Sequence, residues 1–109
     1  MNKTRRKELV EIQEEIKSFK LDAEALKEKI EELKDKIEAV RDEEEMAYDN
    51  LLESLQESEK GERMQNAMDS MDEAMSDLDD VINSIEYCVS EMEDSLEYAV
   101  NNLQEAIDA

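Results

Sequence analysis

Apolar residues recur along this chain at alternating spacings of three and four, in two long runs separated by a polar stretch. A period of 3.5 residues keeps one face of an α-helix on a partner helix, so the runs predict two long helices with seam positions a and d. The first run consists of Leu9, Ile12, Ile16, Phe19, Ala23, Leu26, Ile30, Leu33, Ile37 and Val40. The second run consists of Met64, Met68, Met71, Met75, Leu78, Ile82, Ile85, Val89, Met92, Leu96, Ala99, Leu103 and Ala106.

The stretch between the runs interrupts the heptad, because Glu44 takes a seam position. It also holds Gly61, the one residue that adopts a positive φ at no cost and that therefore favours a chain reversal. The sequence predicts an all-α fold with a single domain over 1–109, built as a long antiparallel two-helix coiled-coil hairpin. We expect the first helix over about 4–50, an elbow over about 52–62 and the second helix over about 63–107.

The hairpin has a predictable register, because antiparallel coiled coils pack a against d and the paired residue numbers then have a constant sum. A sum of 115 gives every seam residue of the first run an apolar partner, from Leu9 with Ala106 to Val40 with Met75. Glu44 opposite Met71 is the one misfit. Charges beside the seam predict the same register, since a sum of 113 sets Lys20, Lys27, Lys34 and Arg41 against Glu93, Glu86, Asp79 and Asp72. Such pairs contribute only ~0–1 kcal/mol each, so they select the register more than they stabilise it.

The second helix carries a further stripe of small, mostly apolar side chains at heptad position g. A two-helix seam does not need this stripe, whereas a helix in a larger bundle does. We therefore expect a homodimer that forms a four-helix bundle, with Ala67, Ala74, Val81 and Cys88 at the interface. The main alternative is a monomer that covers this face with a different protein.

Composition excludes several classes of function. The chain has no His and one Cys, so it lacks the residues of a Cys/His zinc site or of a Ser-His or Cys-His catalytic pair. No carboxylate pair lies in a recognisable pocket, and we expect neither an enzyme nor a metal or other cofactor. A net charge of -20 disfavours direct binding to nucleic acid or to an anionic membrane. No apolar run approaches a membrane span or a signal peptide, so a cytoplasmic protein is expected.

The charge is unevenly distributed along the chain. Residues 1–41 are balanced, residues 42–63 carry -7, and residues 64–109 carry 13 acids and no base. An acidic helix surface often serves only solubility, but solvated helices usually contain bases as well. The other interpretation is nucleic-acid mimicry. At about 1.5 Å per residue the second helix is ~69 Å long, and two hairpins side by side would carry one net charge per ~1.7 Å, as duplex DNA does.

The mimicry interpretation predicts that the basic groove of a nucleic-acid-binding protein is the partner. The candidate binding residues are acids of the second helix: Asp69, Asp72, Asp79, Asp80, Glu86, Glu93, Asp94 and Glu97. The e-position acids among them also serve the hairpin. The alternative function is a structural or adaptor coiled coil whose charge serves only solubility.

The stretch 42–62, about a fifth of the chain, includes the elbow and contains the sequences Asp-Asn-Leu-Leu-Glu-Ser-Leu-Gln at 49–56 and Ser-Glu-Lys-Gly-Glu at 58–62. It resembles a motif of small acidic helical-hairpin proteins of phages and prophages of Gram-positive bacteria, in which the pattern is Asp-Asn-Leu-Pro-Glu-Ser-Leu-Gln followed by Ser-Glu-Arg-Gly-Glu. This chain departs from it at Leu52, where Pro is expected, and at Lys60, where Arg is usual. The resemblance implies a phage origin and, by analogy, an inhibitor of host defence of the anti-CRISPR or anti-restriction type.

Overall fold

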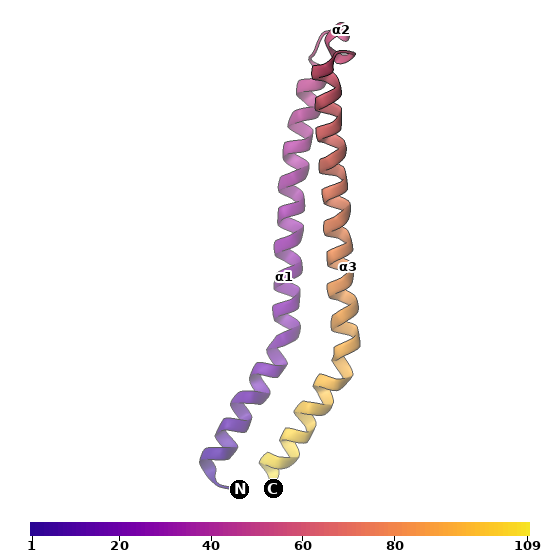
Figure 1. Cartoon of the computed structure of the whole chain (residues 1–109). Helices are drawn as coiled ribbons and strands as arrows, with labels where there is room; N and C mark the ends of the chain where they lie inside the picture. The colour runs from indigo at the N-terminus through magenta and orange to yellow at the C-terminus, as the bar shows by residue number, and fades with distance from the viewer. The chain divides into compact units, whose positions relative to one another are not determined.

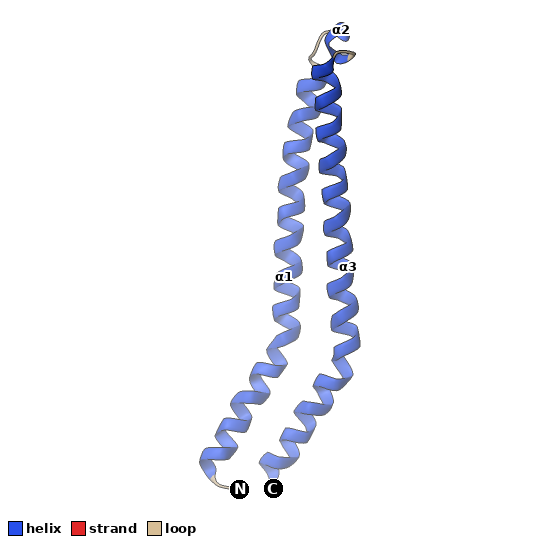
Figure 2. Ribbon diagram, in the orientation of Figure 1, coloured by secondary structure: helices blue, strands red, loops and turns tan.

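The computed structural model describes residues 1–109 and consists of helices joined by short turns (Figures 1 and 2). The helices are α1 (Lys3–Asp49), α2 (Glu53–Gln56) and α3 (Glu59–Asp108). The long helices α1 and α3 run antiparallel, and the short α2 lies in the elbow between them. The predicted all-α helical hairpin is confirmed.

The chain forms two compact units, each containing a part of α1 and a part of α3. The terminal unit consists of Met1–Lys27 and Asn83–Ala109, and the elbow unit is the continuous segment Glu28–Ile82. Both units are two-helix segments, so each has only one neighbouring helix with which to bury apolar surface. As a result the core is thin: the buried hydrophobic residues are Ile30, Met68 and Ile82, all in the elbow unit.

The elbow is shorter than the sequence predicted, because α3 already begins at Glu59. The side-chain amide of Gln56 caps the end of α1: it donates to the carbonyl oxygen of Tyr48 at 3.0 Å and to that of Leu51, just beyond the helix, at 3.4 Å. The last carbonyls of a helix have no partner within the helix, and the Gln56 amide supplies one. The reversal is thus completed between residues 50 and 58, before the predicted position of the second half of the elbow.

Gly61 has a different role from the one predicted. It lies inside α3 and is buried, and no glycine in the chain has a positive φ. A Cβ atom at this position would overlap the backbone carbonyl of Gln56. The glycine therefore permits a close backbone approach between α2 and the first turn of α3, and the reversal itself needs no left-handed residue.

Candidate interaction surfaces

Heptad position e forms a ladder of contacts between α1 and α3, which we call the e-edge ladder. All four ion pairs predicted from the charge pattern are present, so the predicted register is confirmed in both units. In the terminal unit the Nζ–Oε1 distances are 3.8 Å for Lys20–Glu93 and 2.8 Å for Lys27–Glu86. In the elbow unit the distances are 2.7 Å for Lys34 Nζ–Asp79 Oδ1 and 3.0 Å for Arg41 Nε–Asp72 Oδ1.

The two ladder cations of the elbow unit have shifted acidities. The hydrogen bond to Asp79 raises the pKa of Lys34 above its ordinary 10.5, and burial opposes this only in part. The hydrogen bond to Asp72 raises the pKa of Arg41 in the same way, with help from Glu45 one turn further along α1. Both groups are therefore fully charged at neutral pH, and the acids facing them are engaged in holding the hairpin.

Two neutral contacts extend the ladder beyond the ion pairs. In the terminal unit the buried Gln13 donates from Nε2 to the carbonyl oxygen of Val100 at 3.0 Å and to Gln104 Oε1 at 3.2 Å. In the elbow unit Gln65 Nε2 donates to the hydroxyl oxygen of Tyr48 at 3.0 Å. Both follow the sum of 113 that relates the ion pairs. Neither contact was predicted, although the neutral residues at the ends of the e rows were visible in the sequence.

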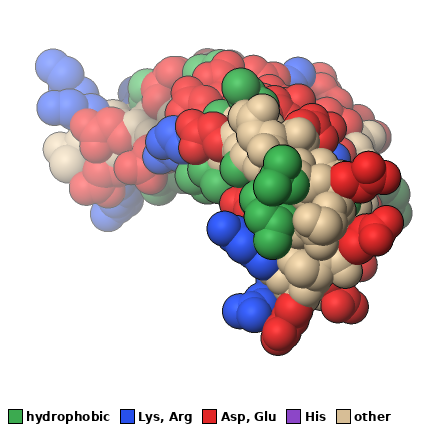
Figure 3. All heavy atoms as spheres, turned by 90° about the horizontal axis from the view of Figure 1, so that it is seen from above, with side chains coloured by type: hydrophobic (Ala, Val, Ile, Leu, Met, Phe, Trp, Pro, Cys, Tyr) green, Lys and Arg blue, Asp and Glu red, His purple; other side chains and the backbone are tan.

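The structure divides the eight predicted partner-binding acids into two groups. Asp72, Asp79, Glu86 and Glu93 form the e-edge ladder with bases of α1. The other four are exposed. Asp80 and Asp94 lie at position f, on the outer face of α3, whereas Asp69 and Glu97 lie at position b, beside the e edge, where each lines a hollow between the helices. Figure 3 shows Asp and Glu side chains (red) over much of the face it presents, with hydrophobic side chains (green) exposed among them.

The opposite edge of the hairpin is apolar and open. Five seam residues of α1, spaced by seven, are between 46% and 54% exposed: Ile12, Phe19, Leu26, Leu33 and Val40. The sequence pattern placed all ten seam residues of the first helix in the core, but only the a positions are half-buried or buried. The hairpin closes on its e edge, and position d, which adjoins g, remains accessible. We call this surface the open face.

The four predicted dimer-interface residues lie at position g of α3, on the α3 side of the open face. Val81 is 43% exposed, Cys88 and Ala67 are exposed, and Ala74 is half-buried. In the elbow unit the same face contains an apolar hollow of about 510 Å³, lined by Leu33, Ile37, Val40, Met71 and Leu78 together with Lys36. These residues are accessible to a partner in the single chain.

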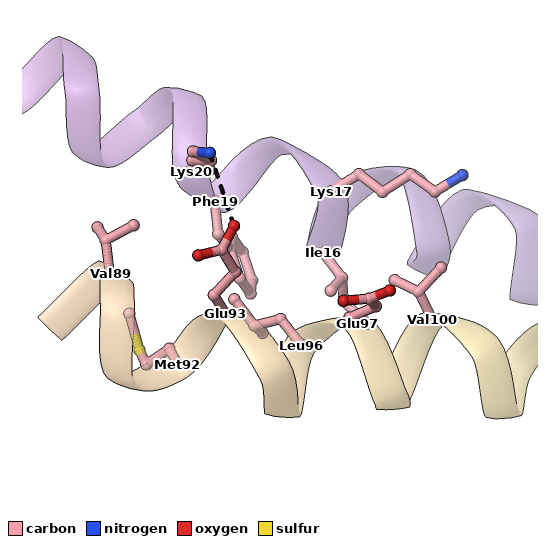
Figure 4. A pocket seen from close by; sticks show the side chains of 10 residues that line it. All are labelled: Ile16, Lys17, Phe19, Lys20, Val89, Met92, Glu93, Leu96, Glu97 and Val100. Atoms are coloured by element: carbon pink, nitrogen blue, oxygen red, sulfur yellow. Dashed lines mark ion pairs between the residues drawn. The ribbon is translucent and has the colours of Figure 1, made fainter.

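The terminal unit contains a cavity of about 320 Å³ between α1 and α3 (Figure 4). Its apolar lining comes from both helices, and the Lys20–Glu93 ion pair spans the helices beside it. The apolar residues that line it are Ile16, Phe19, Val89, Met92, Leu96 and Val100. The terminal unit is therefore loosely packed, in agreement with the buried hydrophobic residues all lying in the elbow unit.

No group of three or more Cys, Asp or Glu side chains is arranged to hold a metal ion. None of the helices combines the length and the apolarity that a membrane span requires. Comparison of the chain with protein-family models, curated proteins and solved structures finds no match in any of the three. The chain thus presents two kinds of candidate interaction surface: exposed acids on α3 and exposed apolar seam residues on α1.

Proposed function

We propose that this chain is a non-enzymatic, acidic protein-binding module that occupies the basic groove of a nucleic-acid-binding protein in place of nucleic acid. The supporting observation is the charge of α3 after the hairpin has formed. Of the 13 acids in residues 64–109, four are engaged in the e-edge ladder, and the other nine are exposed on a segment without a single base.

The acidic surface of α3 is complementary in charge to a cationic groove. The bases of α1 neutralise only the e edge of α3, so the outer positions present one sign of charge along the helix. Such a surface attracts a basic groove over a Debye length and accelerates association at low ionic strength. The resemblance of the elbow to phage proteins fits an inhibitor of a bacterial defence protein, acting in the cytoplasm of the host.

The open face favours a second function, a structural or adaptor coiled coil. In that case the half-exposed row from Ile12 to Val40 would bind the partner, and the acids would only keep the protein soluble. The two functions predict different responses to salt and to charge removal: both changes should weaken binding through the acids, whereas apolar contacts are insensitive to both.

The experiment is capture of proteins from a bacterial lysate on the immobilised chain, followed by elution with a duplex DNA oligonucleotide. Mimicry predicts that captured DNA-binding proteins are released by the oligonucleotide and that capture falls by about tenfold or more between 50 and 200 mM salt. The variant Asp69→Asn, Asp80→Asn, Asp94→Asn and Glu97→Gln should capture much less. The matched control neutralises four acids of α1, Glu11, Glu24, Glu28 and Glu31, and should capture as well as the unmodified chain.

Capture that survives the α3 changes, or that the oligonucleotide does not reverse, contradicts mimicry. If the same proteins are instead lost when Leu33 is replaced by Gln, the adaptor function is the correct one.

A further inference from the structure

The open face leaves a row of apolar side chains exposed. Five seam residues of α1, from Ile12 to Val40, are each between 46% and 54% exposed in the single chain. An exposed apolar row of this kind marks an interaction surface.

The charges beside the open face identify the partner as a second copy. Position g of α1 holds Glu15 and Asp22, then Lys29 and Lys36. All four side chains are exposed, and none forms an ion pair within the chain. When two such rows run antiparallel, the acids of each copy face the bases of the other. This is the complementarity that the symmetric contact of a two-fold dimer requires.

The complementary register has a sum of 51. It sets Asp22 against Lys29 and Glu15 against Lys36 of the second copy, and by symmetry each pair occurs twice. The two-fold axis then passes between residues 25 and 26 of α1. Glu8 faces Glu43 of the second copy at the ends of the row, where solvent screens the repulsion.

The hairpin register locates the same axis on α3. Since level positions of α1 and α3 have a sum of 113 along the e-edge ladder, residues 25 and 26 lie level with residues 88 and 87. Cys88 occupies position g there, and the next g residues on either side, Val81 and Ser95, become level with each other across the axis. The α1 charges thus set the axis, and the hairpin contacts relate it to the level of Cys88 on α3.

We propose that two copies of this chain associate through their open faces as an all-antiparallel four-helix bundle. In it α1 packs against α1 with Asp22 facing Lys29 of the second copy, and α3 packs against α3 about Cys88. The d residues of α1, from Ile12 to Val40, become buried in the common core. This association goes beyond the binding function proposed above and does not depend on it, because it uses the opposite edge of the hairpin.

The first test is the mass of the purified chain by light scattering at micromolar concentrations. The expected mass is twice the 12.7 kDa of one chain. The mass of a single chain over the whole micromolar range overturns the proposal. No partner protein is present in this measurement, so its outcome is separate from that of the capture experiment.

Charge reversal tests the register. Lys29→Glu sets two acids against each other at two symmetric positions and should weaken the dimer by about tenfold or more. Adding Asp22→Lys restores the opposite signs and should restore the dimer. Lys17→Glu makes the same charge change on α1 away from the open face, and should alter dimerisation by about twofold at most. Equal effects of Lys29→Glu and Lys17→Glu overturn this register, and circular dichroism checks that each variant remains helical.

Cross-linking tests the position of the axis. With diamide as the oxidant, two Cys88 thiols give up two protons and two electrons to form one disulfide, and the expected product is a covalent dimer. A mixture of Cys88→Ser with Val81→Cys and Cys88→Ser with Ser95→Cys should also cross-link, whereas each variant alone should not. Cα atoms must come within about 7 Å for a disulfide, so failure of Cys88 and of the mixture overturns the proposed axis.

Discussion

Gln13 on α1 donates a hydrogen bond of 3.0 Å to the backbone carbonyl of Val100 on α3, and it is the one buried polar side chain of the terminal unit. Its amide nitrogen also reaches Gln104 Oε1. The amide therefore donates hydrogen bonds to two oxygens of α3, in a unit that has little apolar core. These hydrogen bonds specify the pairing of α1 with α3 in the terminal unit.

Gln13→Glu should destabilise the hairpin by about 1–3 kcal/mol, because a carboxylate would face two acceptor oxygens in a buried position. Burial would raise the pKa of the new carboxyl, so the loss should disappear below its ordinary pKa of about 4.3, where both states are protonated. Urea unfolding at a fixed protein concentration, at pH 7 and pH 3.5, measures this. Gln65→Glu is the control: it is exposed beside the Tyr48 hydroxyl, which can donate, and should cost less than about 0.5 kcal/mol. Equal losses for the two variants would contradict the role given to Gln13.

The Lys34–Asp79 pair should make stability depend on pH in the alkaline range. The pKa of Lys34 is raised in the folded chain above the ordinary 10.5, so the pair stabilises fully below pH 10.5 and is lost as pH rises through the folded-state pKa. The thermal midpoint should therefore fall less steeply above pH 10.5 in Lys34→Met than in the unmodified chain. Lys17→Met removes a lysine whose ion pair with Glu14 lies within one helix. That control should keep the full alkaline slope, and identical slopes for all three proteins would refute the prediction.

Gly61→Ala should destabilise the elbow unit, although Ala is the better helix former. A methyl group would overlap the Gln56 carbonyl, which is backbone and cannot rotate away. We expect a loss of about 1–3 kcal/mol in urea unfolding, against a gain of about 1 kcal/mol at an unconstrained helical glycine. Ser70→Ala at an exposed position of α3 supplies the reference for propensity alone, with an expected gain of up to ~0.5 kcal/mol. A gain at residue 61 would mean that the elbow backbone is not as close as described.

Leu52→Pro should stabilise the chain. Leu52 has φ -59 and ψ 144, a conformation that proline adopts, and its N–H donates to no acceptor in the chain. Its side chain is 71% exposed, so little packing is lost. A gain of about 0.4–1 kcal/mol is expected from the reduced entropy of the unfolded chain. Leu55→Pro removes an N–H that donates to the Leu52 carbonyl at 2.8 Å and should instead cost about 1 kcal/mol.

The register of the hairpin was predictable because it depends on sequence periodicity and on opposite charges. Lys27 and Glu86, for example, form an ion pair at 2.8 Å. Their pairing could be predicted from the seven-residue spacing and the sum of 113 without knowing the structure of the turn. The candidate acids were predictable only as a set. Asp79 forms a ladder ion pair whereas Asp69 does not, and this difference depends on the edge of the seam at which the two helices close.

The elbow and the open face were less predictable, for two physical reasons. Gly61 was interpreted through its freedom in φ, whereas its role is the missing Cβ, and sequence alone does not distinguish the two. The heptad pattern predicts that position d of α1 is buried, because the pattern does not specify how far each helix is rotated about its own axis at the seam. Phe19 is 47% exposed because the hairpin closes on the Lys20 edge.

The ladder contacts differ greatly in the length of chain that each must close. Gln65 and Tyr48 are 17 residues apart, whereas Gln13 and Val100 are 87 residues apart. Because loop-closure entropy rises with length and each earlier contact shortens the next loop, we expect the hairpin to form from the elbow toward its ends. We expect unfolding to run in the opposite direction. The terminal unit, with its cavity and its single buried amide, should then fray first, while the elbow unit keeps the register in which the ends re-form.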